Sequence, residues 1–407
     1  MEIVIHRGAH EIGGTCIELR HSDGARLILD AGRPLDAPDD AVDLLPSSLS
    51  REGEATVLIC HSHRDHWGLI SELPAHWPVW AGESSAGLIE LTAGLFQGSL
   101  GRELHKWKGW QTFEVGPFKI RPFLTDHSAF DAQMLLIEAE GKRILYSGDF
   151  RRHGRKSRLV DDMMAHPPGD VDLLLLEGTN LGSDKPAMPE TEIEQQFVQL
   201  MTETPGRIFA SWSAQNIDRT VSIYRAAKRS GRTLVVDLYT ADVLETVGAF
   251  APGVPRAGFP NFKVVITHGL SKLYGDRGRQ EFVERMVRQG IAAVKMQGSR
   301  DVVMLRDKLV KNFSEKGVIP TSEDAFVWSS WRGYFDEDAP AVQWLATAGV
   351  TPRFIHTSGH ASPADLRAFA AAVKAARIVP VHGAAWDSEA QGFDALTRLP
   401  DGQVMTL

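Results

Sequence analysis

The sequence predicts an α/β protein whose first domain is interrupted by a second domain of parallel sheet and helices. Residues 1–189 contain short apolar runs, several of which end in a histidine or a carboxylate. Residues 190–345 alternate helical and strand patterns, which is typical of a parallel sheet flanked by helices. Residues 346–407 again hold apolar runs that end in histidine, so we expect them to complete the first domain.

The elements of the first domain are predicted from apolar runs bounded by glycine, proline and polar residues. Four strands are expected first, at 3–5, 16–19, 26–29 and 56–59. Helical patterns follow at 67–73 and 84–107, separated by a break between two prolines at 74–78. Further strands are expected at 113–115 and 118–122, and three strand-and-loop units at 123–128, 144–150 and 171–179.

The second domain is predicted from helical spacing that alternates with β-branched runs. Helices are expected at 192–202, 216–228 and 281–289, and strands at 207–210, 233–238 and 324–328. In the last segment, a strand at 353–356 precedes a helix that Ser362 caps, that Pro363 begins and that runs to about residue 376. A final strand at 378–381 leads into His382.

Composition bounds the function only loosely. The chain has 407 residues, a formal charge of −8 and a pI near 6.0, which argues against a globally basic nucleic-acid binder but leaves local positive charge open. The two cysteines, Cys16 and Cys60, lie in apolar contexts and are expected to be buried and unbridged. Neither a secretory signal nor a membrane span is indicated, so we expect a cytoplasmic protein without a membrane partner.

The strongest motif follows the strand at 56–59. It places His61, His63, Asp65 and His66 within six positions. Residues two apart in an extended segment point the same way, so His61 and His63 can converge on one ion. Asp65 and His66 lie at the expected start of a helix, where they can turn toward a second ion. Imidazoles and a carboxylate are ligands for zinc or a similar ion, whereas the alternative is a polar strand end with chance histidines.

Other candidate ligands lie at the ends of separate apolar runs. Taken singly, each is also explained as an ordinary polar strand end, but together with the motif they supply enough ligands for two ions about 3.5–4 Å apart. Asp30 also ends a strand, and we expect it to orient ligands rather than to bind metal. The predicted ligands are His61, His63, Asp65, His66, His127, Asp149 and His382.

A second constellation lies before the helix that Ser362 caps. Ser358, Gly359 and His360 offer backbone N–H groups near a helix start, a natural anion site. His360 can protonate a leaving alkoxide or hold a phosphate, and Glu177 can fix the tautomer of its ring. The alternative is a loop histidine and an exposed glutamate.

The H-x-H-x-D-H pattern resembles the metallo-β-lactamase superfamily of hydrolases. With the inserted α/β segment, Glu177 in Glu-Gly-Thr-Asn, His360 in Ser-Gly-His-Ala and His382 in Val-His-Gly, the chain resembles the β-CASP nucleases of that superfamily, including ribonuclease J. This resemblance implies an αββα sandwich with an inserted β-CASP domain. It also implies that His382 favours RNA over DNA, since this position is usually valine in members that cut DNA.

The resemblance further implies how the ligands are shared. One ion would be bound by His61, His63 and His127, the other by Asp65, His66 and His382, and Asp149 would bridge them. The ions would be two Zn²⁺, with Mn²⁺ as the alternative. Three features depart from ribonuclease J. Ala384 replaces a common glutamate, and the sequence of segment 328–334 is not the one usual in ribonuclease J. The further C-terminal domain is not expected in this chain.

We therefore predict a ribonuclease in which a metal-activated hydroxide attacks a phosphodiester of single-stranded RNA, with Asp65, His360, Glu177 and Asp30 as its catalytic residues. Exonuclease and endonuclease modes, and a homodimer, stay open. The main rival is a small-molecule metallohydrolase of the same core fold, acting on an ester, thioester or lactone. A nuclease directed at DNA and a catalytically silent scaffold are the others.

Substrate contacts are predicted less sharply. Arg151 begins a basic run that either binds phosphate or is a solvated loop. Ser211 and Ser213 lie at a strand-to-helix turn that can seat a phosphate. Trp331 and Tyr334 can stack bases, although an aromatic core is the preferred interpretation.

Overall fold

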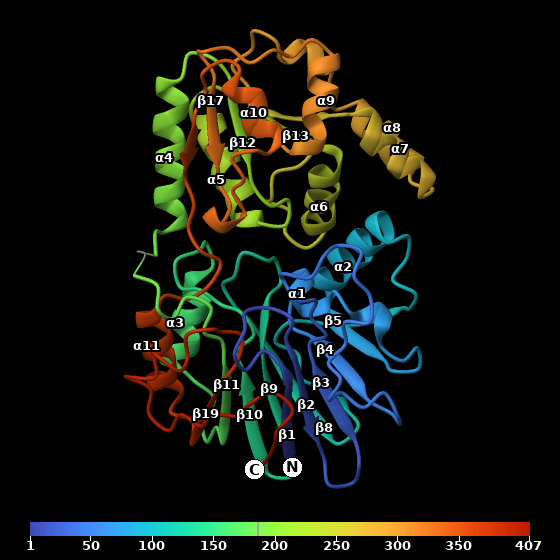
Figure 1. Cartoon of the computed structure of the whole chain (residues 1–407), viewed down its shortest axis with the longest axis vertical. Helices are drawn as coiled ribbons and strands as arrows, with labels where there is room; N and C mark the ends of the chain where they lie inside the picture. The colour runs from blue at the N-terminus through green and yellow to red at the C-terminus, as the bar shows by residue number, and fades with distance from the viewer. Residues whose placement is uncertain (185–186) are drawn as a thin grey trace. The chain divides into compact units, whose positions relative to one another are not determined.

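The computed structural model describes residues 1–184 and 187–407, which form two compact units (Figure 1). The first unit comprises Met1–Ala187 and Gly359–Leu407, and the second, Met188–Ser358, is inserted into it. The sequence pattern predicted that the inserted domain ends at residue 345, but the inserted unit continues to Ser358. The reason is that β18 (Pro352–Phe354) pairs with β17 (Ala325–Trp328) in the sheet of the second unit.

The first unit contains a seven-stranded sheet in the order β20-β1-β2-β3-β4-β5-β6. β3, β4, β5 and β6 run parallel, and β1 pairs antiparallel with both β2 and β20. The strands are β1 (Glu2–Arg7), β2 (Cys16–Arg20), β3 (Arg26–Leu29), β4 (Thr56–Ile59), β5 (Val79–Gly82), β6 (Leu104–Trp107) and β20 (Val404–Thr406).

A six-stranded sheet in the order β19-β11-β10-β9-β8-β7 forms the second layer. β10, β11 and β19 are parallel, while β9 is antiparallel to both β8 and β10. β8, β10, β11 and β19 therefore all end at the same edge. The strands are β7 (Phe113–Val115), β8 (Phe118–Leu124), β9 (Gln133–Ala139), β10 (Lys142–Tyr146), β11 (Leu173–Leu176) and β19 (Arg377–Pro380).

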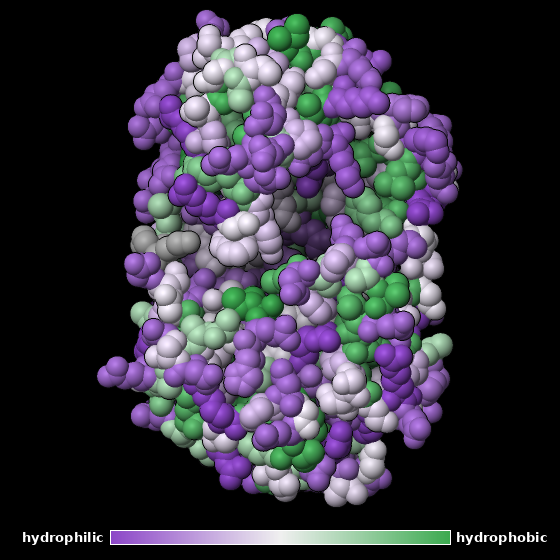
Figure 2. All heavy atoms as spheres, viewed as in Figure 1, coloured by the Kyte–Doolittle hydropathy of each residue, from purple (hydrophilic) through white to green (hydrophobic). Residues whose placement is uncertain are grey.

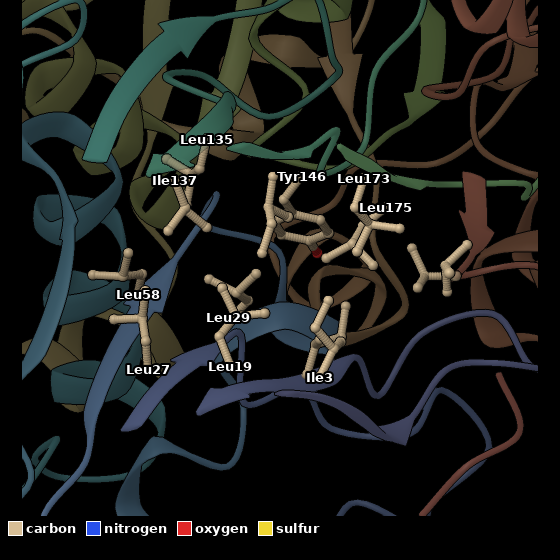
Figure 3. Close-up of a cluster of buried hydrophobic side chains, with 14 of the residues drawn as sticks. Ile3, Leu19, Leu27, Leu29, Leu58, Leu135, Ile137, Tyr146, Leu173 and Leu175 are labelled. Carbon is tan, nitrogen blue, oxygen red and sulfur yellow. The ribbon is translucent and has the colours of Figure 1, made fainter. Parts of the chain in front are cut away.

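The two sheets face each other across a buried apolar core (Figure 3). Leu29 and Leu58 enter it from the first sheet, and Leu135, Ile137 and Leu175 enter it from the second. Side chains alternate between the two faces of a strand, so the neighbouring residues of each strand point outward against helices. Burying both faces of both sheets in this way yields four layers, an αββα sandwich.

Helices cover the outer face of each sheet. Trp67 and Ile89 pack on the first sheet, and Val160 and Phe369 pack on the second. The sandwich predicted from the resemblance is thereby confirmed. Its helices are α1 (Arg64–Trp67), η1 (Ile70–Glu72), α2 (Glu83–Phe96), α3 (Ser157–Ala165) and α11 (Pro363–Val373).

The second unit is built on a parallel sheet in the order β15-β14-β13-β16-β12-β17-β18. Its strands are nearly all apolar, as expected when helices flank a sheet. The remaining strands are β12 (Ile208–Ser211), β13 (Leu234–Asp237), β14 (Phe262–Val265), β15 (Gly290–Ile291) and β16 (Val302–Met304).

Polar side chains cap α5 and α6 of the second unit. The side chain of Asn216 accepts a hydrogen bond from the backbone of Arg219 to start α5, and Asp237 accepts one from Thr240 to start α6. The helices are α4 (Glu190–Glu203), α5 (Ile217–Arg229), α6 (Leu238–Gly248), α7 (His268–Asp276), α8 (Gln280–Val287), η2 (Ala293–Met296), α9 (Asp307–Glu315), η3 (Arg332–Tyr334) and α10 (Pro340–Ala346).

Two predictions for the first domain were wrong in part. The helix expected at 84–107 ends at Phe96, and residues 104–107 form β6 instead. Glycines at 98 and 101 follow the helix with positive φ, and β6 gains its stability by pairing with β5, which local spacing does not reveal. Of the helix expected at 67–73, only Trp67, at the end of α1, and Ile70–Glu72, in η1, are helical.

Within the described residues, no helix combines the length and the apolar composition required to cross a membrane. In the space-filling view, hydrophilic side chains occupy much of the visible face of each unit, with hydrophobic ones scattered among them (Figure 2).

Candidate metal centre

The ends of strands in both sheets of the first unit assemble the centre. His61 and His63 follow β4, and Asp65 and His66 lie in α1, which begins at Arg64. The second sheet supplies residues from its shared edge, because β8, β10, β11 and β19 run in one direction. These residues are His127, Asp149, Glu177 and His382.

One group of three imidazoles lies at this edge. The ligand atoms of His61, His63 and His127 all lie within 4.8 Å of one another. His127 Nε2 is 3.1 Å from His63 Nδ1 and 3.9 Å from Asp149 Oδ2. Three nitrogens that face one another at this spacing are suited to a zinc-like ion.

A second group consists of Asp65, His66, Asp149 and His382, whose ligand atoms also lie within 4.8 Å of one another. Asp149 Oδ2 is 3.1 Å from His66 Nε2 and 3.7 Å from His382 Nε2. It is also 3.7 Å from His61 Nε2, so this carboxylate faces both groups. The seven predicted ligands are therefore brought together, with Asp149 between the two sets.

Unsatisfied polar atoms indicate that these groups fit a cation. His61 Nε2, His382 Nε2 and Asp149 Oδ1 are buried and have no hydrogen-bond partner among the described residues. A buried polar group without a partner is costly, and native proteins nearly always satisfy it. Divalent ions held by these atoms would satisfy them, and the donor set suits zinc.

Neighbouring side chains orient the ligands. Asp30 Oδ2 is 2.8 Å from His66 Nδ1 and accepts a hydrogen bond from Tyr146 at 2.6 Å, and Asp30 Oδ1 accepts one from the backbone of Cys60. Thr15 Oγ1 is 2.8 Å from His382 Nδ1. Asp30 thus occupies the outer position expected of it, whereas sequence reasoning missed Thr15 and Tyr146, which no local motif marks.

The backbone is adapted to this arrangement at several points. Asp30 and His382 have φ of 61° and 49°, a left-handed conformation that is uncommon outside glycine. Gly148, with φ of 49°, precedes Asp149, and a Cβ there would press on the Gln133 carbonyl and Cys60. Gly32 lies so close to the Asp65 carbonyl that any side chain would overlap it. Strained conformations of this kind gather where function constrains the chain.

Burial sets the protonation of the first group. It lowers the pKa of His61 and of His127 well below the ordinary value, and it lowers the pKa of His63 to about 4. Neutral imidazole is the form that binds metal, so these three residues are already in the ligating state at neutral pH.

Charges dominate in the second group. Burial would raise the pKa of Asp149, but His382, His66 and His360 hold it well below its usual range. Burial would lower the pKa of His66, but the carboxylates of Asp149 and Asp30, among others, raise it well above the ordinary value. The ionised Asp149 therefore stays available as a negative ligand between the two groups.

His360 and Glu177 form a pair beside Asp149. His360 Nδ1 lies 3.4 Å from Glu177 Oε1 and 3.8 Å from Asp149 Oδ2. Although burial lowers the pKa of His360, Glu177 and Asp149 raise it to about 9. Glu177 is fully buried and accepts hydrogen bonds from the backbones of Phe150 and Thr179, so the exposed-glutamate alternative is wrong.

Family models agree with this geometry. Residues 26–247 match a model described as a beta-lactamase superfamily domain, and residues 352–392 match one described as a Zn-dependent metallo-hydrolase RNA specificity domain. The chain belongs to the metallo-β-lactamase superfamily, in its β-CASP, ribonuclease J-like group.

Several relatives that the chain matches are named ribonuclease J. Ribonuclease J of Sinorhizobium meliloti is 22% identical over 94% of this chain, and that of Mycobacterium tuberculosis is 25% identical over 92%. Ribonuclease J of Thermus thermophilus is 28% identical over 58%. The matches cover 69%, 67% and 44% of those relatives, so part of each lies outside the match.

A solved structure shares the metallo-β-lactamase fold over the whole chain. It is a protein of unknown function from Enterococcus faecalis V583, with a TM-score of 0.77 and 20% identity, covering 100% of this chain and 99% of its own. At this identity the likeness concerns the fold alone.

The structure places the predicted substrate contacts in different environments. Arg151 is fully buried and pairs with Asp126, so the prediction that it contacts a phosphate does not fit the structure. Ser211 is buried too, and its hydroxyl donates to the Leu305 carbonyl. Ser213 is exposed and its Oγ accepts from the backbone of Gln215.

The loop before α11 is arranged as the sequence suggested. Ser362 accepts a hydrogen bond from the backbone of Asp365 and caps α11, as predicted. The Gly359 carbonyl is 2.6 Å from His127 Nδ1, so Gly359 orients a candidate ligand. Ser358 is the last residue of the second unit, and His360 belongs to the first.

Proposed function

We propose that this chain is a metal-dependent ribonuclease that hydrolyses phosphodiester bonds of single-stranded RNA at the candidate metal centre. The observation that carries the proposal is the convergence of seven predicted ligands around Asp149, with the His360–Glu177 pair beside them. The ribonuclease J relatives and the RNA specificity model support RNA as the substrate.

In this proposal the centre would hold two Zn²⁺. His61, His63 and His127 would hold one ion, Asp65, His66 and His382 would hold the other, and Asp149 would contact both. The Zn-dependent family model and the two side-chain groups support this division. Imidazole and carboxylate ligands also accept manganese, so Mn²⁺ is the alternative ion. Bound divalent ions supply Lewis acidity at the phosphate and lower the pKa of water to near 7.

His360 assists departure of the leaving group. As a new bond forms from the attacking oxygen to phosphorus, the bond to the ester oxygen breaks, and that oxygen needs a proton. The imidazolium of His360 directs Nδ1 toward Glu177 and retains a second N–H, on Nε2, for the phosphate or the leaving oxygen. Glu177, held by two backbone N–H groups, orients the ring and favours its protonated form.

The test uses purified protein loaded with Zn²⁺ or Mn²⁺ and 5′-labelled single-stranded RNA, with DNA of the same sequence alongside. Stepwise shortening from the 5′ end indicates an exonuclease, and discrete internal cuts indicate an endonuclease. We expect Asp65→Ala to lose metal and activity together. We expect His360→Ala to keep its metal but lower kcat by about 10²–10⁴-fold.

Surface changes provide the controls. His166→Ala and Asp40→Ala alter exposed residues of the same unit, and we expect both variants to cleave like the parent. Cleavage of a simple ester together with no cleavage of RNA or DNA would overturn the proposal in favour of a small-molecule hydrolase. Preferential cleavage of DNA would overturn the assignment of RNA.

A further inference from the structure

An exposed aromatic cluster lies in the second unit, after β17. Trp331 and Tyr334 are 55% and 57% exposed, so the preferred interpretation of both as core residues is wrong. Phe354, at the end of the neighbouring strand β18, is 38% exposed. Single exposed aromatic residues are common, but a group of them marks a binding surface.

The side chains of this cluster contact one another. The rings of Trp331 and Tyr334 meet edge to face with centroids 4.9 Å apart, and Phe354 meets Phe335 in the same way at 5.1 Å. The guanidinium of Arg332 lies 4.4 Å from the centroid of Phe354. Aromatic faces combined with an arginine are the chemistry that binds the bases of single strands.

The backbone holds the cluster in place. The Trp331 carbonyl accepts hydrogen bonds from Trp328 Nε1 at 3.2 Å and from the backbone of Tyr334 at 3.1 Å. Any Cβ at Gly333 would overlap the indole ring of Trp331, so the ring lies directly against this glycine. A surface that is ordered before binding loses less entropy when a ligand arrives.

The charge around the cluster selects among ligands. Arg332 and Arg353 are exposed, but so are Asp336, Glu337 and Asp338. With no excess of positive charge, the surface is poorly suited to a duplex, whose affinity comes mainly from phosphates. Unpaired bases, which bind by stacking, fit it better.

The position in the fold also favours a ligand site. β12, β17 and β18 are parallel, and open α/β sheets bind ligands beyond the carboxyl ends of their strands. Trp331 follows the end of β17, and Phe354 ends β18. The match to the RNA specificity model begins at residue 352 and so includes Phe354.

We propose that Trp331, Tyr334 and Arg332 form a stacking site for unpaired bases of single-stranded RNA. This inference rests on the proposed function for its ligand. It adds a binding surface in the second unit that helps to retain the substrate strand.

The test measures binding of labelled single-stranded oligoadenylate by the full chain. An Asp65→Ala background prevents cleavage in every sample. Trp331→Ala is compared with Trp331→Phe, which keeps a ring, and with Phe250→Ala, which removes another exposed aromatic residue of the second unit. Gly333→Ala is a second route to the same effect, because it displaces the ring without deleting it.

We expect Trp331→Ala and Gly333→Ala to weaken binding about tenfold, while Trp331→Phe and Phe250→Ala stay within about twofold. An abasic oligomer with the same phosphates should bind all five proteins equally. Unchanged affinity in Trp331→Ala, or an equal loss for the abasic oligomer, would overturn the inference. So would a change in oligomeric state, because the cluster would then be a protein interface.

Failure of this inference is distinguishable from failure of the proposed function. Cleavage of a small phosphodiester by the protein with an intact Asp65 tests the centre alone, and we expect Phe250→Ala to leave its rate unchanged. A protein that cleaves RNA but binds equally well without Trp331 refutes only the stacking site. A protein that stacks bases but cleaves nothing refutes only the proposed reaction.

Discussion

Single side chains outside the ligand set fix how the ligands point. Thr15 is the clearest case, because its hydroxyl is 2.8 Å from His382 Nδ1 while His382 Nε2 faces Asp65 and Asp149. We expect Thr15→Val to lower metal affinity by about 10–100-fold with little change in fold. Competition with a chromogenic chelator measures the affinity, and Thr202→Val, at an exposed position, is the control. Parental affinity in Thr15→Val would show that His382 needs no such partner.

A buried ionic cluster makes the first sheet sensitive to acid. Burial would raise the pKa of Glu18, but hydrogen bonds from His6, Arg20 and Arg26 lower it to about 2. The folded state therefore gains stability from ionised Glu18 above the ordinary pKa of 4.5. This gain, about 2–3 kcal/mol, is lost as the pH falls from 4.5 toward 2.

Urea unfolding at pH 6 and pH 3.5 measures this effect, with chelator present throughout so that metal loss does not contribute. We expect Glu18→Gln to be less stable at pH 6 and to depend less on pH than the parent. The same loss of stability between the two pH values in both proteins would contradict this role of Glu18.

At the scale of elements, the loop between β18 and α11 both contacts a candidate metal ligand and contains His360. Its Gly359 carbonyl orients His127, and His360 follows immediately. A Cβ on Gly359 would lie 2.7 Å from Ser128 Oγ and 3.3 Å from the His127 ring. We therefore expect Gly359→Ala to shift the loop, weaken metal binding and reduce RNA cleavage at least tenfold.

The matched control is Gly269→Ala in α7, where a Cβ would have no atom within 4 Å and where alanine favours the helix. Metal content and single-turnover cleavage are measured for both variants. Equal behaviour of the two would mean that the loop before α11 tolerates displacement.

For the whole molecule, metal binding should stabilise one unit selectively. All candidate ligands belong to the first unit, so ions bound there raise its unfolding free energy by about 2.7 kcal/mol at a hundredfold excess over Kd. Hydrogen exchange followed by peptide mass spectrometry checks this. Chelation should reduce protection in β10 and β11 and leave β12 and β13 unchanged. Equal loss in both units would indicate that they unfold together.

Most residues of the centre could be predicted from the sequence, because each of them follows the end of an apolar run that is recognisable locally. β4 and the motif after it lie where expected, and the shared direction of β8, β10, β11 and β19 explains why separate strand ends meet. Resemblance to a known family, rather than spacing, supplied the assignment of each ligand to an ion.

What could not be predicted depends on contacts between distant segments. Thr15 and His382 are 367 residues apart, and neither shows in sequence that the other is near. Arg151 stands in a basic run, yet Asp126 draws it into the interior. Trp331 has a largely apolar side chain, yet it is exposed, because its ring lies against Gly333 of its own loop rather than in the core.

Diffraction at the zinc absorption edge, from crystals of metal-loaded protein, shows directly whether two ions lie beside Asp149. We expect two anomalous peaks about 3.5–4 Å apart on either side of Asp149. One should contact His61, His63 and His127, and the other Asp65, His66 and His382. Peaks located elsewhere, or no peak beside Asp149 in protein that cleaves RNA, would contradict the proposed two-ion centre.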